Sequence, residues 1–86
     1  MSRVTVYSTA NCSFCKLTKD ELAQWNIPFD EVRIDLDAAA LEAFKANTNG
    51  ARTVPQILID GEPIGGFSEL TELHMDGDLD ELMETD

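Results

Sequence analysis

The hydrophobic positions of this chain follow two different spacings. Alternating apolar and polar residues, or a short apolar run between turn residues, predict a β-strand, whereas apolar residues that recur every three or four positions predict a helix. The chain is therefore expected to form strands at residues 4–6, 29–34, 55–59 and 62–64, and helices from the cysteines to residue 25, over residues 38–46, from Ser68 to the break at Gly77 and over residues 78–83.

Individual residues mark where these elements begin and end. Pro28 stops the first helix because a proline disfavours helical geometry at the preceding residue. Asp37 and Ser68 are expected to cap the second and third helices. Asp60-Gly61 is a typical two-residue hairpin turn. Four residues at helical spacing predict the apolar face of the first helix: Phe14, Leu17, Leu22 and Trp25.

The order of the elements predicts an α/β fold, β-α-β-α-β-β-α with a short C-terminal helix. Two strands joined by a helix form a parallel pair with a right-handed crossover, and the hairpin adds an antiparallel edge. The expected architecture is a four-stranded mixed sheet flanked by helices. With 86 residues, the chain is expected to form a single domain over residues 1–86.

Charge narrows the classes of partner. The chain has 17 acidic and 6 basic residues, a net charge of −11, so its average field repels nucleic acid and anionic lipid. This charge either keeps a small protein soluble or steers it toward a basic patch on a partner protein. No apolar run approaches the ~20 residues that span a bilayer, and the first residues alternate like a strand rather than a signal peptide. We therefore expect a cytoplasmic protein without nucleic-acid or membrane partners.

Two cysteines, Cys12 and Cys15, lie between a polar loop and the first helix. In a reducing compartment this spacing indicates redox or metal chemistry rather than a structural disulfide. The start of a helix stabilises a thiolate, so Cys12 is expected to be the attacking nucleophile and Cys15 the resolving thiol. A zinc site needs two further ligands, and the chain has no third cysteine and a single histidine, His74. A pair of inert buried thiols is the other alternative.

Two more segments have features of a binding site. Pro55 in Thr53-Val54-Pro55 either holds a cis peptide and leaves the Val54 backbone free for an extended, peptide-like ligand, or is an ordinary trans proline, which the local sequence favours. Gly65-Gly66-Phe67-Ser68-Glu69 is a glycine turn that leads into a helix. Such a helix start binds carboxylates through its N–H groups, and Glu69 can pair with an ammonium group. The alternative is a capped helix without a ligand.

Taken together, these segments resemble the glutaredoxin family. The resemblance covers nearly the whole chain and rests on Cys12-Ser13-Phe14-Cys15 and on residues 51–57, 60–61, 64–70 and 73–79 in that order. It implies a thioredoxin-like fold, a cis Pro55 and an enzyme that uses glutathione as co-substrate to reduce protein disulfides and glutathione mixed disulfides. The expected partners are disulfide-containing or glutathionylated proteins, with ribonucleotide reductase as a family possibility, and the expected state is a monomer.

The resemblance also assigns site residues. In the family, the backbone of the residue matching Val54 pairs with the cysteine of glutathione, and the γ-glutamyl end lies against the turn before the third helix. By position, the implied catalytic residues are Cys12 and Cys15, with no resident metal. The implied glutathione-binding residues are Tyr7, Phe14, Arg52, Thr53, Val54, Pro55, Gly66, Phe67, Ser68 and Glu69.

Three positions depart from the family pattern. Ser13-Phe14 replaces the common Pro-Tyr, and some relatives with serine there hold a [2Fe-2S] cluster between two chains through the first cysteine and glutathione. Thr9 stands where lysine is frequent, and Glu42 where glutamine or arginine meets the glycyl carboxylate. One such exposed pair contributes about 0.2–1 kcal/mol, a few-fold in affinity. Two alternatives stay open: a redoxin reduced by thioredoxin reductase, and a cluster-binding dimer held through Cys12.

Overall fold

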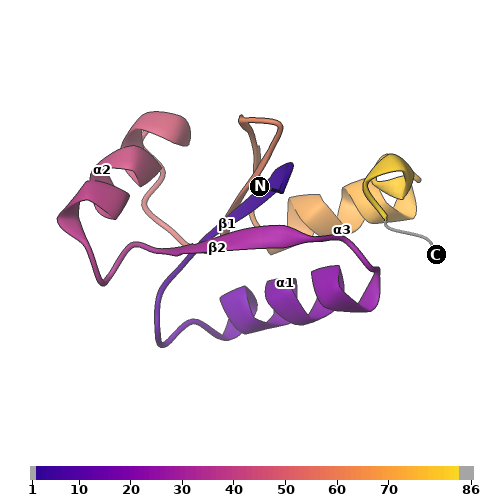
Figure 1. Cartoon of the computed structure of the whole chain (residues 1–86), viewed down its shortest axis with the longest axis horizontal. Coiled ribbons are helices and arrows are strands. Elements are labelled where there is room, and N and C mark those ends of the chain that lie inside the picture. The colour runs from indigo at the N-terminus through magenta and orange to yellow at the C-terminus, as the bar shows by residue number, and fades with distance from the viewer. Residues whose placement is uncertain (1, 84–86) are drawn as a thin grey trace.

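The computed structural model describes residues 2–83, all but the two ends of the expected domain at residues 1–86. Within these residues the elements follow the predicted order (Figure 1). They are β1 (Val4–Ser8), α1 (Ser13–Gln24), β2 (Phe29–Arg33), α2 (Ala38–Asn47), β3 (Gln56–Ile59), β4 (Glu62–Gly65), α3 (Phe67–Met75) and the 3₁₀ helix η1 (Asp80–Leu82). None of these helices has both the length and the apolar character that crossing a bilayer requires.

The strands form one mixed sheet in the order β2-β1-β3-β4. β1 is parallel to β2 and antiparallel to β3, and β4 is antiparallel to β3. The β3–β4 turn consists of Asp60 and Gly61, whose φ angles of 53° and 83° are both positive, as a tight turn between twisted strands requires. The predicted α/β fold with a four-stranded mixed sheet is confirmed.

Helices cover both faces of the sheet. Figure 1 shows α2 at the upper left, α1 below the strands and α3 at the right; Leu22 of α1 and Leu70 of α3 pack in one buried cluster, and Phe44 of α2 packs in another. Two buried clusters lie beneath them, because neighbouring side chains of a strand point to opposite faces. The α1–α3 face buries Val4, Val6, Leu22, Ile27, Ile57, Leu70, Leu79 and Leu82, and the α2 face buries Tyr7, Phe44 and Leu58. The central strands β1 and β3 are therefore held from both sides.

The register of the central strands positions the functional site. Tyr7 near the end of β1 lies opposite Gln56 at the start of β3. The loop that follows β1 and the loop that precedes β3 therefore meet at the same end of these two central strands. The first of these loops leads to Cys12 and the second contains Val54 and Pro55.

The predicted apolar face of α1 is partly wrong. Phe14 is 57% exposed and Leu17 is 45% exposed, whereas the buried residues of this helix are Cys15, Thr18 and Leu22. Thr18 can occupy the buried face because its hydroxyl donates a hydrogen bond to the Phe14 carbonyl oxygen at 2.8 Å, which satisfies the polar group without water. In the first half of α1, the buried positions are thus Cys15 and Thr18, each one residue after the predicted positions Phe14 and Leu17.

The predicted cap of the third helix is also wrong. Helix α3 begins at Phe67, with Gly66 as its N-cap residue, so Ser68 lies inside the first turn. The Gly66 N–H donates to Glu69 Oε1 at 2.7 Å, and this side chain supplies the bond that ties the helix start to the preceding turn. Asp37 caps α2 as predicted, since its Oδ1 accepts from the Ala39 N–H at 2.9 Å. The C-terminal helix is shorter than the predicted residues 78–83.

Candidate active site

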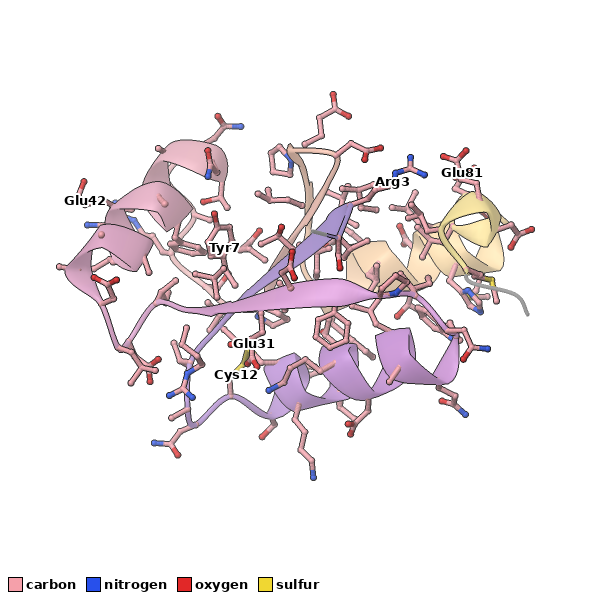
Figure 2. The ribbon with its side chains drawn as sticks, viewed as in Figure 1. Arg3, Tyr7, Cys12, Glu31, Glu42 and Glu81 are labelled. Carbon is pink, nitrogen blue, oxygen red and sulfur yellow. A yellow bond between two sulfur atoms is a disulfide. The ribbon has the colours of Figure 1, made fainter. Side chains whose placement is uncertain are left out.

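Cys12 and Cys15 form a disulfide at the start of α1, with their Cα atoms 5.2 Å apart. Cys12 is the N-cap residue of this helix (Figure 2). The two sulfurs differ in access: Cys12 is half-buried, whereas Cys15 is 1% exposed. An external disulfide can therefore reach Cys12, while Cys15 can attack only a sulfur already attached to Cys12.

The helix start favours a thiolate at Cys12. The Cys15 N–H donates to Cys12 Sγ at 3.0 Å, and the first turn of α1 contains no acidic residue. A backbone N–H and the positive end of the helix dipole both stabilise negative charge on this sulfur once the disulfide is reduced. Cys12 as the attacking nucleophile stays a prediction, and these two contacts favour it.

The second part of the site lies beside Cys12. The Val54–Pro55 peptide bond is cis, as the family resemblance implies. The Val54 carbonyl oxygen is 3.6 Å from Cys12 Sγ. A disulfide sulfur has no hydrogen to donate, so this contact is a close approach of the two atoms.

A groove of about 260 Å³ begins at this point. It is lined by Phe14, Thr53, Val54, Pro55, Gln56, Gly66, Phe67, Ser68 and Glu69. The structure therefore brings together eight of the predicted binding residues, which come from α1, the loop before β3 and the start of α3. Gln56, the first residue of β3, also lines the groove and was not predicted.

The two walls of the groove approach closely at Gly66. A Cβ atom at this position would lie 3.2 Å from the Pro55 carbonyl oxygen, which is tighter than ordinary van der Waals contact. Phe14 and Phe67 face each other across the opening, with ring centroids 5.7 Å apart and planes tilted by 43°. The groove is thus narrow at its backbone floor and apolar at its rim.

Two predicted binding residues lie outside this lining. Tyr7 is 4% exposed, because α2 covers its face of the sheet and Phe44 packs edge-on against its ring at 5.4 Å. Its hydroxyl accepts a hydrogen bond from Asn47 Nδ2 at 3.1 Å. Arg52 is exposed on the loop next to Thr53. Tyr7 therefore belongs to the core. Arg52 precedes the lining residue Thr53 in the sequence but does not itself line the groove.

Comparison with known proteins decides the family. Residues 4–64, more than half of the chain, match the family model described as Glutaredoxin. The chain belongs to the glutaredoxin family. This glutaredoxin is 36% identical over 83 residues to Glutaredoxin 1 of Rickettsia typhi, covering 95% of this chain and 80% of that protein. It is 37% identical over 83 residues to Glutaredoxin 3 of Escherichia coli strain K12, covering 96% and 99%.

A solved structure is similar as well. The crystal structure of a buckwheat glutaredoxin–glutathione complex superposes with a TM-score of 0.81 at 28% identity, covering 95% of this chain and 76% of that one. The thioredoxin-like fold implied by the sequence is confirmed. Family membership, together with the paired Cys12 and Cys15, supports thiol–disulfide oxidoreductase activity for this glutaredoxin.

The loop that carries Cys12 is anchored to the turn that follows β2. The Ala10 N–H donates to Asp35 Oδ2 at 3.0 Å, and Arg33 donates to both oxygens of the same carboxylate, at 2.8 Å from Nε and 2.7 Å from Nη2. The Arg33 hydrogen bond, aided by the Ala10 N–H, lowers the pKa of Asp35 to about 2. The carboxylate therefore stays charged and keeps its hold on the loop over most of the pH range.

Replacing this carboxylate gives a pH-dependent prediction. We expect Asp35→Asn to lower the free energy of unfolding at pH 7, because the amide keeps an acceptor for Ala10 and loses the charge beside Arg33. A lowered pKa stabilises the folded state fully above the ordinary value of 3.8, and this contribution disappears as the pH falls toward about 2. Urea unfolding of both proteins at pH 7, 4 and 2 measures the difference, and a difference independent of pH would contradict the assignment.

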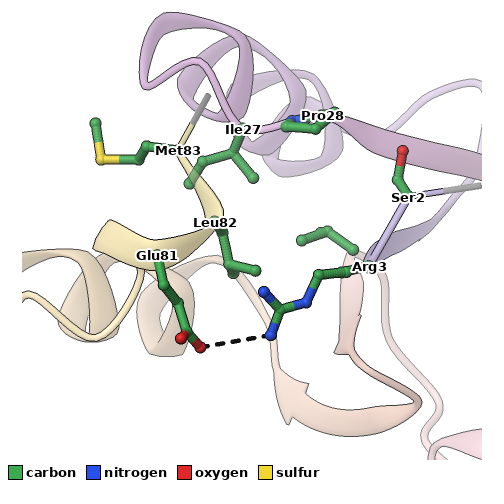
Figure 3. Close-up of a pocket in the computed structure, with 8 residues that line it drawn as sticks. Ser2, Arg3, Ile27, Pro28, Glu81, Leu82 and Met83 are labelled. Atoms are coloured by element: carbon green, nitrogen blue, oxygen red, sulfur yellow. Dashed lines mark hydrogen bonds and ion pairs between the residues drawn. The ribbon is translucent and has the colours of Figure 1, made fainter. Parts of the chain in front are cut away.

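A second pocket of about 350 Å³ lies away from the sulfurs of this glutaredoxin. Figure 2 places Arg3 and Glu81, two of its lining residues, well apart from Cys12. Arg3 donates to Glu81 at 3.4 Å (Figure 3) and, through two nitrogens, to Asp60 at 2.8 and 2.7 Å. Its charged group is therefore already paired, and the pocket lies at the junction of the start of β1, the loop between α1 and β2, and η1.

Proposed function

We propose that this glutaredoxin uses glutathione to reduce protein disulfides and glutathione mixed disulfides, with Cys12 as the nucleophile and Cys15 as the resolving thiol. The observation that carries the proposal is the unequal access to the two sulfurs. Cys12 is accessible at the helix start beside the groove, whereas Cys15 is 1% exposed behind it. The proposed partners are glutathione and disulfide-containing or glutathionylated proteins, and the proposed setting is the cytoplasm.

The reaction follows from this arrangement. With a glutathione mixed disulfide, the Cys12 thiolate attacks the glutathione sulfur and the protein thiolate leaves. A second glutathione thiolate then attacks the Cys12–glutathione disulfide, which releases oxidised glutathione and restores Cys12. With a protein disulfide, Cys12 forms a mixed disulfide with the protein and Cys15 displaces it, which leaves a protein dithiol and the Cys12–Cys15 disulfide; two glutathione molecules then reduce that disulfide.

The groove supports glutathione as the reductant. The Val54 carbonyl oxygen borders Cys12 Sγ at 3.6 Å, so a peptide-like thiol that attacks Cys12 passes beside this backbone and can pair with it. In the proposed complex, the γ-glutamyl end lies at the start of α3, near Ser68 and Glu69, and Phe14 and Phe67 form the apolar rim. The similar buckwheat protein is a complex with glutathione.

The test compares two sources of electrons. The substrate is the mixed disulfide of glutathione and 2-mercaptoethanol, supplied either with glutathione and glutathione reductase or with thioredoxin reductase, each with NADPH. We expect turnover with the glutathione system and none above background with thioredoxin reductase. The reverse result would replace this proposal with a redoxin fed by thioredoxin reductase, the alternative that Thr9 and Glu42 leave open.

A further inference from the structure

The charge among the side chains that line the groove is only negative. Of the residues that line it, only Glu69 carries a charge at neutral pH. Glu69 Oε1 accepts the Gly66 N–H at 2.7 Å, and Oε2 has no hydrogen-bond partner among the described residues. The groove therefore offers a free carboxylate oxygen to a ligand and no cationic side chain.

The chain around the groove is strongly asymmetric in charge. All six lysines and arginines lie within residues 1–52, whereas residues 53–86 contain ten of the 17 acidic residues and no Lys or Arg. The second part of the chain therefore carries ten of the eleven net negative charges. This part supplies every lining residue of the groove except Phe14.

Helix α3 displays this charge next to the groove. Glu69, Glu72 and Asp76 follow one another at spacings of three and four and so share one face of the helix region, and all three are exposed. Within residues 2–83, none of them forms an ion pair, while Arg3, Lys19 and Arg33 are already paired with other carboxylates. We call Glu69, Glu72 and Asp76 the acidic face of α3.

We propose that the groove and the acidic face of α3 select polypeptide disulfides whose reacting cysteine is flanked by Lys or Arg. This inference rests on the proposed function, because it names the substrate class of the same site. The exposed Phe14, near Cys12, provides an apolar contact for the polypeptide. The acidic face of α3 pairs with the positive charge of its Lys or Arg side chains. Opposite charges raise the rate of encounter by about 10–10³-fold at low salt and lose this effect as salt screens them.

The test measures single-turnover oxidation of the reduced protein without glutathione. The oxidants are three disulfide-linked peptide dimers of one sequence, with Lys, Gln or Glu on both sides of the cysteine. In each reaction the Cys12–Cys15 dithiol is oxidised to the disulfide and the peptide dimer is reduced to two thiols. Each rate is divided by the rate of the same dimer with dithiothreitol, which removes the effect of the flanking residues on the intrinsic reactivity of the peptide disulfide.

We expect normalised rates in the order Lys, Gln, Glu, with about a tenfold or larger ratio of Lys to Glu at low salt and a much smaller ratio at 1 M salt, where the Debye length is about 3 Å. Glu69→Gln keeps the acceptor for Gly66, and Glu72→Gln changes charge outside the groove. Each is expected to lower the Lys-to-Glu ratio by about 1.4- to fivefold, the range of one exposed charge pair.

Asp20→Asn is the matched control. Asp20 is exposed on α1, about two turns beyond Cys12, so this variant changes the net charge equally and leaves the ratio unchanged. Equal normalised rates for the three peptides, or an equal fall in the Asp20 variant, would overturn the proposal. Because no glutathione is present, this test is independent of the test of the proposed function. A peptide preference without glutathione-dependent turnover would contradict the proposed function alone. Glutathione-dependent turnover without a peptide preference would contradict this inference alone.

Discussion

Cys12→Ser is expected to reduce all disulfide and mixed-disulfide reduction to the uncatalysed background. A serine hydroxyl at the helix start cannot form the mixed disulfide through which exchange proceeds. Cys15→Ser is expected to retain reduction of glutathione mixed disulfides, because that cycle needs only Cys12 and a second glutathione. The same variant is expected to lose reduction of disulfides within a protein, because it lacks the buried thiol that releases the substrate protein from its mixed disulfide with Cys12.

The measurement is glutathione-dependent turnover of a glutathionylated peptide and of a peptide with an internal disulfide, for wild type and both variants. Each variant is isosteric with the wild type, and circular dichroism of the reduced proteins checks that all three are folded alike. If Cys15→Ser lost deglutathionylation as completely as Cys12→Ser, the assignment of nucleophile and resolving thiol would be wrong.

Leu22→Ala is expected to have the largest effect on stability. Leu22 is 0% exposed in the cluster between α1 and the sheet, so truncation removes buried methyl groups and leaves a cavity, at a cost of about 2–5 kcal/mol. Leu17→Ala removes the same atoms from the same helix. Because Leu17 is 45% exposed, this variant is expected to stay within about 0.5 kcal/mol of the wild type.

Thermal unfolding of the oxidised proteins compares the pair. In a domain of this size, 1 kcal/mol corresponds to a shift in Tm of about 4–8 °C, so Leu22→Ala separates clearly from Leu17→Ala. Similar losses in the two variants would mean that Leu17 is buried, as the sequence pattern predicts, and that α1 is rotated from the orientation described above.

The comparison of these leucines also shows what the sequence could predict. The elements and their order followed from apolar spacing and turn residues, because strands, helices and the Asp60-Gly61 turn depend on nearby residues. The rotation of α1 did not follow, because it depends on which residues the sheet and α3 present to it. Burial of Thr18 required a hydrogen bond to the Phe14 carbonyl oxygen at 2.8 Å, which no hydrophobic pattern contains.

The sequence likewise predicted some parts of the site and not others. The paired cysteines and the segments around Val54 and Gly66 carried recognisable signals, and the structure brings the two segments to one groove beside Cys12. Tyr7 lies outside the groove lining, and the sequence did not show this because the burial of Tyr7 depends on Phe44, which is distant in sequence and 5.4 Å away in space. Gln56 was missed because its place in the groove depends on where the loop before β3 ends.

The single tryptophan has a consequence for spectroscopy. Trp25 stacks on His74, with ring centroids 3.7 Å apart and planes within 10°, and it caps the C-terminal end of α1. Cys12 caps the other end of this 12-residue helix, about 20 Å away along the axis. Tryptophan emission therefore reports on the docking of α1 against α3. A change in emission during a redox titration therefore indicates a change in the packing of these two helices and is not by itself a signal from the sulfurs.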